Sequence, residues 1–105
     1  MTDKVVVLTT AGNESEAHKI AQELVERRLA ACVNMIPRIQ SVYRWEGKVE
    51  TAEELLLIIK TTKTRSAEVK AAIRELHGYD LPECILIAME DGSAEYLMWI
   101  EESVG

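Results

Sequence analysis

The chain has 105 residues and a mass of 11.8 kDa, and we expect residues 1–105 to form one domain. Hydrophobic residues make up 48% of it, which suffices for a core and argues against intrinsic disorder. Eighteen acidic and twelve basic residues give a net charge of −6, which disfavours duplex nucleic acid as a partner. No apolar run is long enough to span a membrane and the first residues do not resemble a signal peptide, so we expect a cytoplasmic protein without membrane contact.

Charge is distributed unevenly along the chain. After Arg74 there is no lysine or arginine, whereas eight acidic residues follow. Such a segment is either a solvated acidic face or a field that attracts cations. The two cysteines, Cys32 and Cys84, occur in a chain without a recognisable secretion signal, so we expect reduced thiols.

The first half of the chain predicts a strand, a helix and a second strand. A β-branched run over residues 4–10 favours a buried strand, and Asn13, with Glu16 three residues later, is typical of a helix start. Apolar residues at helical spacing follow up to about residue 25. From about 31 to 45 the pattern becomes that of a strand, in which Pro37 predicts a bulge or bend.

The second half repeats this order. Glu46-Gly47 is a good hairpin turn, after which a second long strand runs to about residue 61. A helix is expected from near Thr64 to Gly78, followed by a buried strand over 84–89. Ser93 then caps a short C-terminal helix. The order predicts an α+β fold, the ferredoxin-like split βαβ arrangement, with both crossover helices on one face of a four-stranded antiparallel sheet.

The hairpin is long for a domain of this size. A two-residue turn at Glu46-Gly47 places Val33 opposite Lys60, and the hairpin is then roughly 40 Å long, against a domain diameter on the order of 34 Å. We therefore expect it to protrude and to carry three apolar side chains with it, Tyr43, Trp45 and Val49. Either a second copy of the chain covers them, or a bend at Pro37 folds the hairpin back over its own sheet.

The segment from His77 to Glu83 combines an imidazole, a phenol and two carboxylates between a helix end and a strand. It could be no more than a helix end followed by a proline-terminated loop. As a functional site it would suit copper or zinc, because an imidazole and carboxylates are ligands that these ions prefer. The candidate ligands from this segment are His77, Asp80 and Glu83, whereas His18 is expected to be a solvated surface residue.

Three basic residues, Lys60, Lys63 and Arg65, precede or begin the second helix. Together with free backbone N–H groups they could hold an anion, or Thr64 could simply cap the helix. The paired-cysteine, HExxH and calcium-loop signatures are absent from the sequence, and no nucleophile–base pair is recognisable, so we do not expect an enzyme.

The chain resembles the CutA family of divalent-cation tolerance proteins over nearly its whole length. The blocks that carry the resemblance are Leu29-Ala30-Ala31-Cys32-Val33-Asn34 leading to Ile36-Pro37, Ser41-Val42-Tyr43-Arg44-Trp45-Glu46-Gly47-Lys48, Glu53 or Glu54 followed by Lys60-Thr61-Thr62, His77-Gly78-Tyr79-Asp80-Leu81-Pro82-Glu83, and Tyr96-Leu97-Met98-Trp99-Ile100.

The resemblance implies a ferredoxin-like subunit in a tight cytoplasmic homotrimer whose hairpins pair across subunits. It also implies a role in copper tolerance, copper(II) or another divalent cation as ligand, no obligatory cofactor and no enzymatic activity. Three residues are taken over as candidate site residues, Cys32, His77 and Tyr79, with Asp80 and Glu83 as weaker additions.

Two positions depart from the family's pattern. Some relatives carry a cysteine connected with copper where this chain has Thr9, so a metal site here must use other groups. The family's common His-Pro-Tyr-Glu is His77-Gly78-Tyr79-Asp80 here, which keeps an imidazole and a carboxylate but frees the loop at Gly78.

Two hypotheses follow. The first is a cytosolic homotrimer that binds copper or similar divalent ions through His77 and nearby carboxylates, with Cys32 as a further candidate ligand. The alternative is a regulatory or scaffold trimer, similar in architecture to the PII signalling proteins, that binds a small anionic ligand or a partner protein at its subunit clefts. Tyr79 and the basic residues Lys60, Lys63 and Arg65 are the candidates for those clefts.

Overall fold

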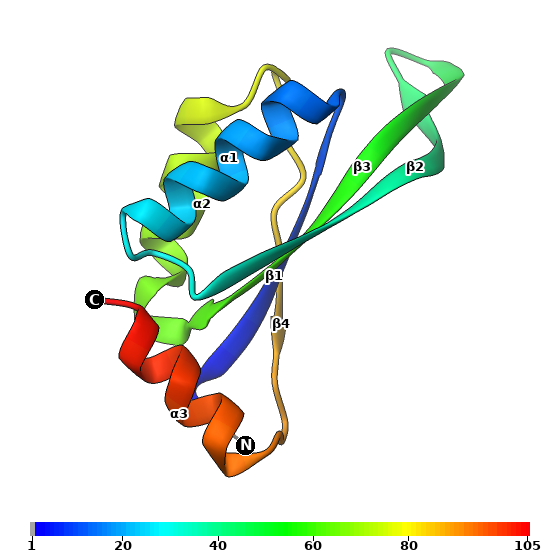
Figure 1. Cartoon of the computed structure of the whole chain (residues 1–105). Coiled ribbons are helices and arrows are strands. Elements are labelled where there is room, and N and C mark those ends of the chain that lie inside the picture. The colour runs from blue at the N-terminus through cyan, green and yellow to red at the C-terminus, as the bar shows by residue number, and fades with distance from the viewer. Residues whose placement is uncertain (1) are drawn as a thin grey trace.

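The computed structural model describes residues 2–105 and contains a four-stranded antiparallel sheet in the order β2-β3-β1-β4. Helices α1 and α2 pack side by side on one face of the sheet (Figure 1). This arrangement confirms the ferredoxin-like fold. In chain order the elements are β1 (Lys4–Ala11), α1 (Glu14–Glu26), β2 (Cys32–Trp45), β3 (Lys48–Thr62), α2 (Lys63–Leu76), β4 (Ile85–Ala88) and α3 (Ala94–Ser103).

The core lies between the sheet and the two crossover helices. Alternate residues of β1 and β3, such as Val7 and Leu57, point toward the helices and are fully buried there. Ile20 and Leu24 of α1 and Ile73 of α2 meet them from the helical layer. The helical spacing of these apolar residues in the sequence therefore predicts the buried faces correctly.

The helix starts are fixed by side-chain caps. Asn13 accepts a hydrogen bond from the backbone N–H of Glu16 at 2.8 Å, as the sequence predicts. The expected cap of α2 is wrong by two residues, because Thr62, the last residue of β3, accepts from the N–H of Arg65 at 3.3 Å. Strand and helix are thus joined without a loop, and α2 begins at Lys63.

A bulge interrupts the pairing of β2 with β3. The turn residues Glu46 and Gly47 have φ values of 48° and 79°, and Trp45 pairs with Lys48 as expected. Beyond Pro37 and Arg38 the register shifts by one residue, so that Cys32 rather than Val33 lies opposite Lys60. Because neighbouring side chains of a strand point to opposite faces, this shift reverses the faces of residues 32–36 of β2 relative to an unbroken pairing from the turn.

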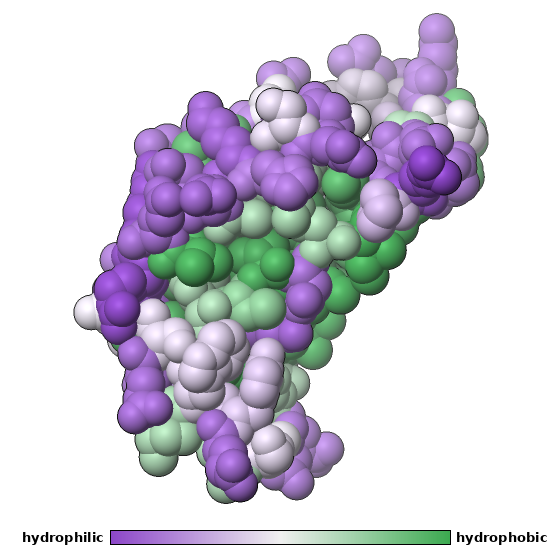
Figure 2. All heavy atoms as spheres, viewed as in Figure 1, coloured by the Kyte–Doolittle hydropathy of each residue, from purple (hydrophilic) through white to green (hydrophobic). Residues whose placement is uncertain are grey.

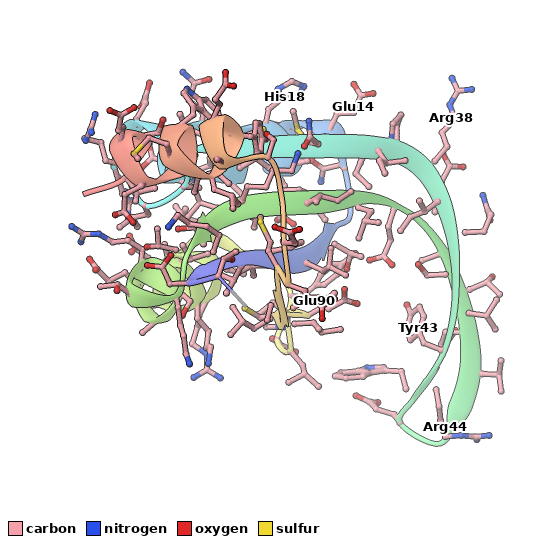
Figure 3. All side chains as sticks on the ribbon, turned by 90° about the horizontal axis from the view of Figure 1, so that it is seen from below. Glu14, His18, Arg38, Tyr43, Arg44 and Glu90 are labelled. Carbon is pink, nitrogen blue, oxygen red and sulfur yellow. The ribbon has the colours of Figure 1, made fainter. Side chains whose placement is uncertain are left out.

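The hairpin beyond this bulge, residues 39–54, is called the arm. It makes the molecule elongated, with principal extents of 44 × 25 × 22 Å, which confirms that the hairpin extends past the core. Tyr43, Trp45 and Val49 are 44%, 42% and 64% exposed in the single chain. The arm curves, and Tyr43 lies on its concave side while Arg38 at the bend points outward (Figure 3).

The prediction of a buried strand over 84–89 is wrong in two respects. β4 is shorter, and its residues Ile85, Leu86 and Ile87 are 48%, 48% and 47% exposed. β4 is an edge strand that pairs only with β1 among residues 2–105, and Ile85 and Ile87 lie opposite Leu8 and Val6 on the face away from α1 and α2. Residues 2–105 form no second layer over most of that face, so the apolar residues of β4 stay exposed.

We call the sheet surface away from α1 and α2 the open face. Hydrophobic atoms reach the molecular surface along the sheet, whereas the helices and the tip of the arm are mainly hydrophilic (Figure 2). An exposed apolar sheet face is typical of an interaction surface. Its apolar side chains are Val6, Leu8, Ile36, Leu56, Ile58, Ile85 and Ile87.

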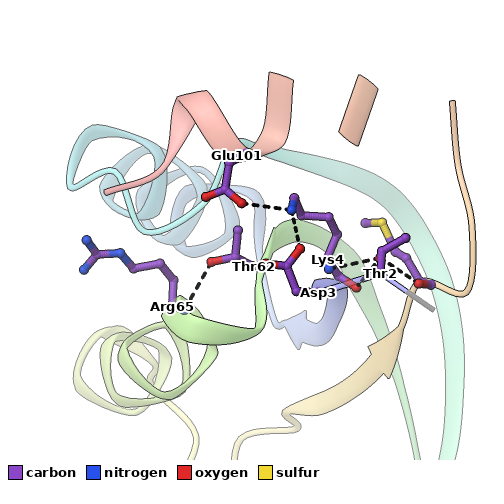
Figure 4. Close-up of polar contacts among 7 residues, drawn as sticks. Thr2, Asp3, Lys4, Thr62, Arg65 and Glu101 are labelled. Atoms are coloured by element: carbon purple, nitrogen blue, oxygen red, sulfur yellow. Dashed lines mark hydrogen bonds and ion pairs between the residues drawn. The ribbon is translucent and has the colours of Figure 1, made fainter. Parts of the chain in front are cut away.

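Helix α3 covers one end of the open face. The Lys4 ammonium group lies between the carboxylates of Asp3 and Glu101 and is 3.0 Å from the latter, which ties α3 to β1 (Figure 4). The ammonium group of Lys60 lies 5.9 Å from the centre of the Tyr96 ring.

None of the helices formed by residues 2–105 is long and apolar enough to cross a membrane.

Candidate functional site

The segment between α2 and β4, residues 77–84, is called the His77 loop. It is tied to the first turn of α1, because the backbone N–H of Gly78 donates to Glu16 Oε2 at 3.0 Å. A Cβ atom on residue 78 would lie 2.7 Å from that oxygen. The glycine that departs from the family's proline therefore gives this loop a bond that proline, which has no N–H, could not make.

The ring of His77 is fully enclosed. Its Nε2 atom lies 2.5 Å from the carbonyl oxygen of Thr10, and its Nδ1 atom lies 3.1 Å from the backbone nitrogen of Tyr79. Because the Thr10 carbonyl can only accept and the Tyr79 amide can only donate, Nε2 is the donor and Nδ1 the acceptor in these two bonds, and Glu16 Oε1 lies 3.5 Å from Nδ1. As a metal ligand, His77 would have to give up one of these two hydrogen bonds.

Next to His77, the Tyr79 phenol forms a fixed pair with Glu54 of β3. The hydroxyl group donates to Glu54 Oε2 at 2.7 Å, and the ring packs at 4.5 Å from the His77 ring. Gly12 makes room for the phenol, because a Cβ atom there would lie 3.0 Å from the hydroxyl oxygen. Burial and the bond to Glu54 both raise the pKa of Tyr79, so it stays a neutral donor at physiological pH.

A cavity of about 830 Å³ separates the arm from the His77 loop. We call it the arm cleft. Its size lies within the range of small-molecule sites. Thr10 and Glu54 contribute to it from the sheet. The other lining residues are Gln40, Ser41, Val42, Tyr43, Arg44 and Trp45 of the arm and Gly78, Tyr79, Asp80, Leu81 and Glu83 of the His77 loop.

The two glutamates of the arm cleft differ in their acidity. Burial opposes the charge of Glu54, but hydrogen bonds from Ser41, Tyr79 and Thr10 outweigh it and lower the pKa of the carboxyl group. Burial and the nearby charge of Glu54 raise the pKa of Glu83. Glu54 is therefore a buried carboxylate, and Glu83 is the group that takes up a proton more readily.

Cys32 lies away from these groups. It pairs with Lys60, and its Sγ is 3.6 Å from Asn34 Oδ1. Thr10, which contacts His77, pairs with Leu56, four residues along β3 from Lys60, or about 13 Å at the usual rise of a strand. His77, Asp80 and Glu83 belong to one loop. The structure separates Cys32 from them, because Cys32 lies at a different part of the sheet.

No group of three or more His, Cys, Asp or Glu side chains within residues 2–105 is arranged to hold one metal ion. The predicted set of His77, Cys32, Asp80 and Glu83 is thus not preassembled in the single chain. Asp80 is exposed and Glu83 is half-buried at the arm cleft, while the other histidine, His18, is exposed on α1 as expected.

The basic residues expected to hold an anion serve separate purposes. Lys60 donates to Asn34 Oδ1 at 2.6 Å on the open face. The backbone N–H of Lys63 donates to the carbonyl oxygen of Asp3 at 2.7 Å. Arg65 pairs with Glu68 of its own helix at 2.8 Å. None of the three lines the arm cleft, whose lining includes one basic residue, Arg44.

Residues 5–103 match the family described as CutA1 divalent ion tolerance protein. The chain belongs to this family. The divalent-cation tolerance protein CutA of Thermus thermophilus is 45% identical over 100 residues, which are 95% of this chain and 97% of that protein. Protein CutA, chloroplastic, of Arabidopsis thaliana is 42% identical over 94% of this chain, which spans only 54% of its length. The crystal structure of CutA from Xylella fastidiosa has a TM-score of 0.97 at 38% identity and covers 99% of this chain and 100% of that one.

In this CutA1 family member, several residues of the site were not singled out from the sequence as functional. Glu54 enters the sequence analysis only as one of two glutamates in a block that carries the family resemblance, without a role of its own, and Glu16 only as part of a helix-capping pattern. Gly12 and Thr10 carry no chemical signal of their own. They matter because of contacts that only the fold creates, those of the Thr10 carbonyl oxygen with His77 and of Gly12 with the Tyr79 phenol.

Proposed function

We propose that this chain acts in divalent-cation tolerance as a cytoplasmic homotrimer that binds copper(II) or similar divalent ions, without an obligatory cofactor and without enzymatic activity. The observation that carries the proposal is the family match over nearly the whole chain, joined to a cleft whose loop supplies an imidazole and two carboxylates. Copper(II) binds imidazole and carboxylate groups well. The cytoplasmic location rests on the sequence of this chain alone. The relatives do not decide it, because one of them is named chloroplastic.

Metal binding would need a change relative to the single chain. Asp80 and Glu83 are the accessible ligands at the arm cleft, and His77 could join them if its bond to the Tyr79 backbone opened. A second copy that approaches the arm could supply further ligands. The proposal therefore predicts that the stoichiometry depends on assembly, with one ion per chain or one per three chains.

The two edges of the sheet support a closed assembly. Among residues 2–105, β2 and β4 each pair with one strand only, so both edges have free backbone groups. Because the edges differ, pairing of β2 in one copy with β4 in the next is head-to-tail and forms a ring when the rotation closes. The exposed open face would then point toward the other copies.

The proposal is tested by calorimetric titration of copper(II) into metal-free protein against a chelator of known affinity. We expect saturable binding that weakens at least tenfold in His77→Ala, while the trimer remains intact in sedimentation. His18→Ala is the matched control, because it removes the chain's other imidazole from an exposed site on α1. Weak binding of excess ions, or equal affinity in both variants, would contradict this assignment.

A further inference from the structure

The carboxylate of Glu16 joins the first turn of α1 to the His77 loop through both of its oxygens. Oε2 accepts a hydrogen bond from the backbone N–H of Gly78 at 3.0 Å, and Oε1 lies 3.5 Å from His77 Nδ1. We propose that Glu16 and His77 are a preassembled pair of ligands for one divalent metal ion, which Oε1 and Nδ1 bind together. The inference rests on the proposed function and deepens it, because it names the carboxylate that acts with His77.

The distance between these two atoms suits a shared metal ion. Ligands that each lie about 2.0–2.2 Å from a zinc ion are separated from one another by roughly 3–3.5 Å. The 3.5 Å between Nδ1 and Oε1 is at the upper end of this range and is longer than an ordinary hydrogen bond. An imidazole nitrogen and a carboxylate oxygen are also ligands that copper(II) and zinc accept.

The atoms of the pair that face away from the ion are already held. Nε2 of His77 donates to the carbonyl oxygen of Thr10, which leaves the lone pair of Nδ1 as the ligand of this ring. A metal-binding histidine usually donates its other ring N–H to a carbonyl or carboxylate oxygen in this way. The Gly78 N–H orients Glu16 through its second oxygen. Because both side chains are held before the ion arrives, little entropy is lost on binding.

The hydrogen bond between Tyr79 and His77 must open when the ion binds. The amide of Tyr79 donates to Nδ1 at 3.1 Å. Its net contribution is small compared with the free energy that metal binding supplies to a folded protein. Gly78 lies directly before this amide and gives the backbone the freedom to turn. Asp80, which is exposed and directly follows Tyr79, moves with the same backbone and is the candidate for a third ligand.

The pair depends on the glycine that distinguishes this chain from the family's common pattern. A proline at position 78 has no N–H and could not hold the Glu16 carboxylate. Even a Cβ atom there would lie 2.7 Å from Glu16 Oε2. The family's pattern at this position therefore excludes the arrangement, and the ligand pair is a property of this sequence.

The ligand pair belongs to the helical layer. Glu16 is in the first turn of α1, and His77 directly follows the last turn of α2, so neither ligand is part of the arm or of a strand edge. The Glu16 side chain is 19% exposed, whereas that of His77 is fully enclosed. An ion would therefore reach Nδ1 past the Glu16 carboxylate. Pairing of strand edges between copies would use other parts of the chain.

The test compares Glu16→Gln with Glu14→Gln in calorimetric titrations of copper(II) into metal-free protein against a competing chelator. Glu16→Gln should bind at least tenfold more weakly, because a neutral amide oxygen is a poorer ligand, although it can still accept from the Gly78 N–H. Glu14→Gln should bind as the wild type does. It is the matched control, since Glu14 is an exposed carboxylate of the same helical turn that enters no ion pair within residues 2–105.

Two spectroscopic measurements distinguish a ligand from an anchor of the loop. The copper EPR spectrum should change in Glu16→Gln, because a charged oxygen leaves the coordination shell, whereas loss of an anchor would weaken binding without altering the spectrum. In a His18→Ala background His77 is the only histidine. NMR of its ring nitrogens during addition of zinc chloride should show a shift of Nδ1, while Nε2 keeps its proton and its bond to Thr10.

The results separate this inference from the copper proposal. If copper binding requires His77 but Glu16→Gln and Glu14→Gln have equal affinities, Glu16 is not a ligand and the inference fails while the proposed function stands. Weaker binding of Glu16→Gln with an unchanged EPR spectrum, or loss of the Nε2 proton on addition of zinc, would also overturn it. A wild type that shows no saturable binding of copper(II) would overturn both proposals.

Discussion

At the scale of single residues, Thr9 carries a buried hydroxyl group that finds no hydrogen-bond partner within residues 2–105. It lies in the C-terminal half of β1 and is fully buried on the side of the helices. An unpaired buried hydroxyl costs free energy, because it has lost its hydrogen bonds to water. The position is also the one at which some family members carry a cysteine, whose thiol is a weaker hydrogen-bonding group.

Thr9→Val should therefore stabilise the protein by about 1 kcal/mol, because it keeps the shape of the side chain and removes the unpaired group. Thr61→Val is the matched control, since Thr61 is equally buried but donates to the carbonyl oxygen of Leu29 at 2.6 Å. That change should destabilise by about 1–2 kcal/mol, as it leaves a buried carbonyl group unpaired. Denaturation midpoints at one fixed protein concentration measure both, and a shift of the same sign in the two variants would contradict the interpretation.

At the scale of elements, α3 is attached to β1 through a charge cluster, in addition to the buried side chain of Ile100. The hydrogen bond from Lys4 lowers the pKa of Asp3 despite some opposing desolvation. The bonds to Asp3 and Glu101 raise the pKa of Lys4. The ionised Asp3 carboxyl group therefore stabilises the fold above its pKa in the unfolded chain, about 3.9. This contribution is lost as the pH falls through the lower pKa that Asp3 has in the folded protein. The Lys4 ammonium group stabilises the fold below its pKa in the unfolded chain, about 10.4. This contribution is lost as the pH rises through the higher pKa that Lys4 has in the folded protein.

Asp3→Asn should lower the stability at pH 7 by at most about 1 kcal/mol, because Asp3 is largely solvent-exposed. The difference from the wild type should shrink as the pH falls below 4, where the wild-type carboxyl group also becomes neutral. Thermal melts across this pH range measure the effect. Glu102→Gln is the control, since Glu102 enters no ion pair among the described residues, and a pH-independent effect of Asp3→Asn would argue against a charge-based attachment.

The sequence predicts most elements but fails where tertiary structure decides. The hairpin turn is correct because Gly47 has a positive φ that its residue type favours, and the bulge follows from Pro37. The cap of α2 is missed because Thr62 and Thr64 have the same capping chemistry and only the end of β3 distinguishes them. The arm cleft joins Thr10, Glu54 and Tyr79, which are far apart in the sequence, so local patterns could not reveal it.

At the scale of the whole molecule, the apolar run of β4 has a different meaning from that in a fully buried strand. Its periodicity is that of a strand covered on both sides, yet among residues 2–105 it only pairs with β1 along one edge, and its side chains stay about half exposed. An apolar edge strand is prone to aggregation unless another chain pairs with it. In the proposed trimer this strand would be buried between copies, which would account for a sequence pattern that the single chain does not satisfy.

This interpretation makes a prediction about one face of β4. Ile87→Lys should convert the proposed trimer to a folded monomer at micromolar concentration, because a lysine ammonium group would have to be buried on the open face between copies. Leu86→Lys is the matched control, since Leu86 is equally exposed in the single chain but pairs with Val7 on the helix side, where we expect a much smaller effect on assembly. Sedimentation velocity measures the mass, and circular dichroism checks that each variant is folded. A wild-type monomer at this concentration would show that something other than a second copy covers the open face. A trimer that persists in Ile87→Lys would show that the copies associate through the strand edges alone.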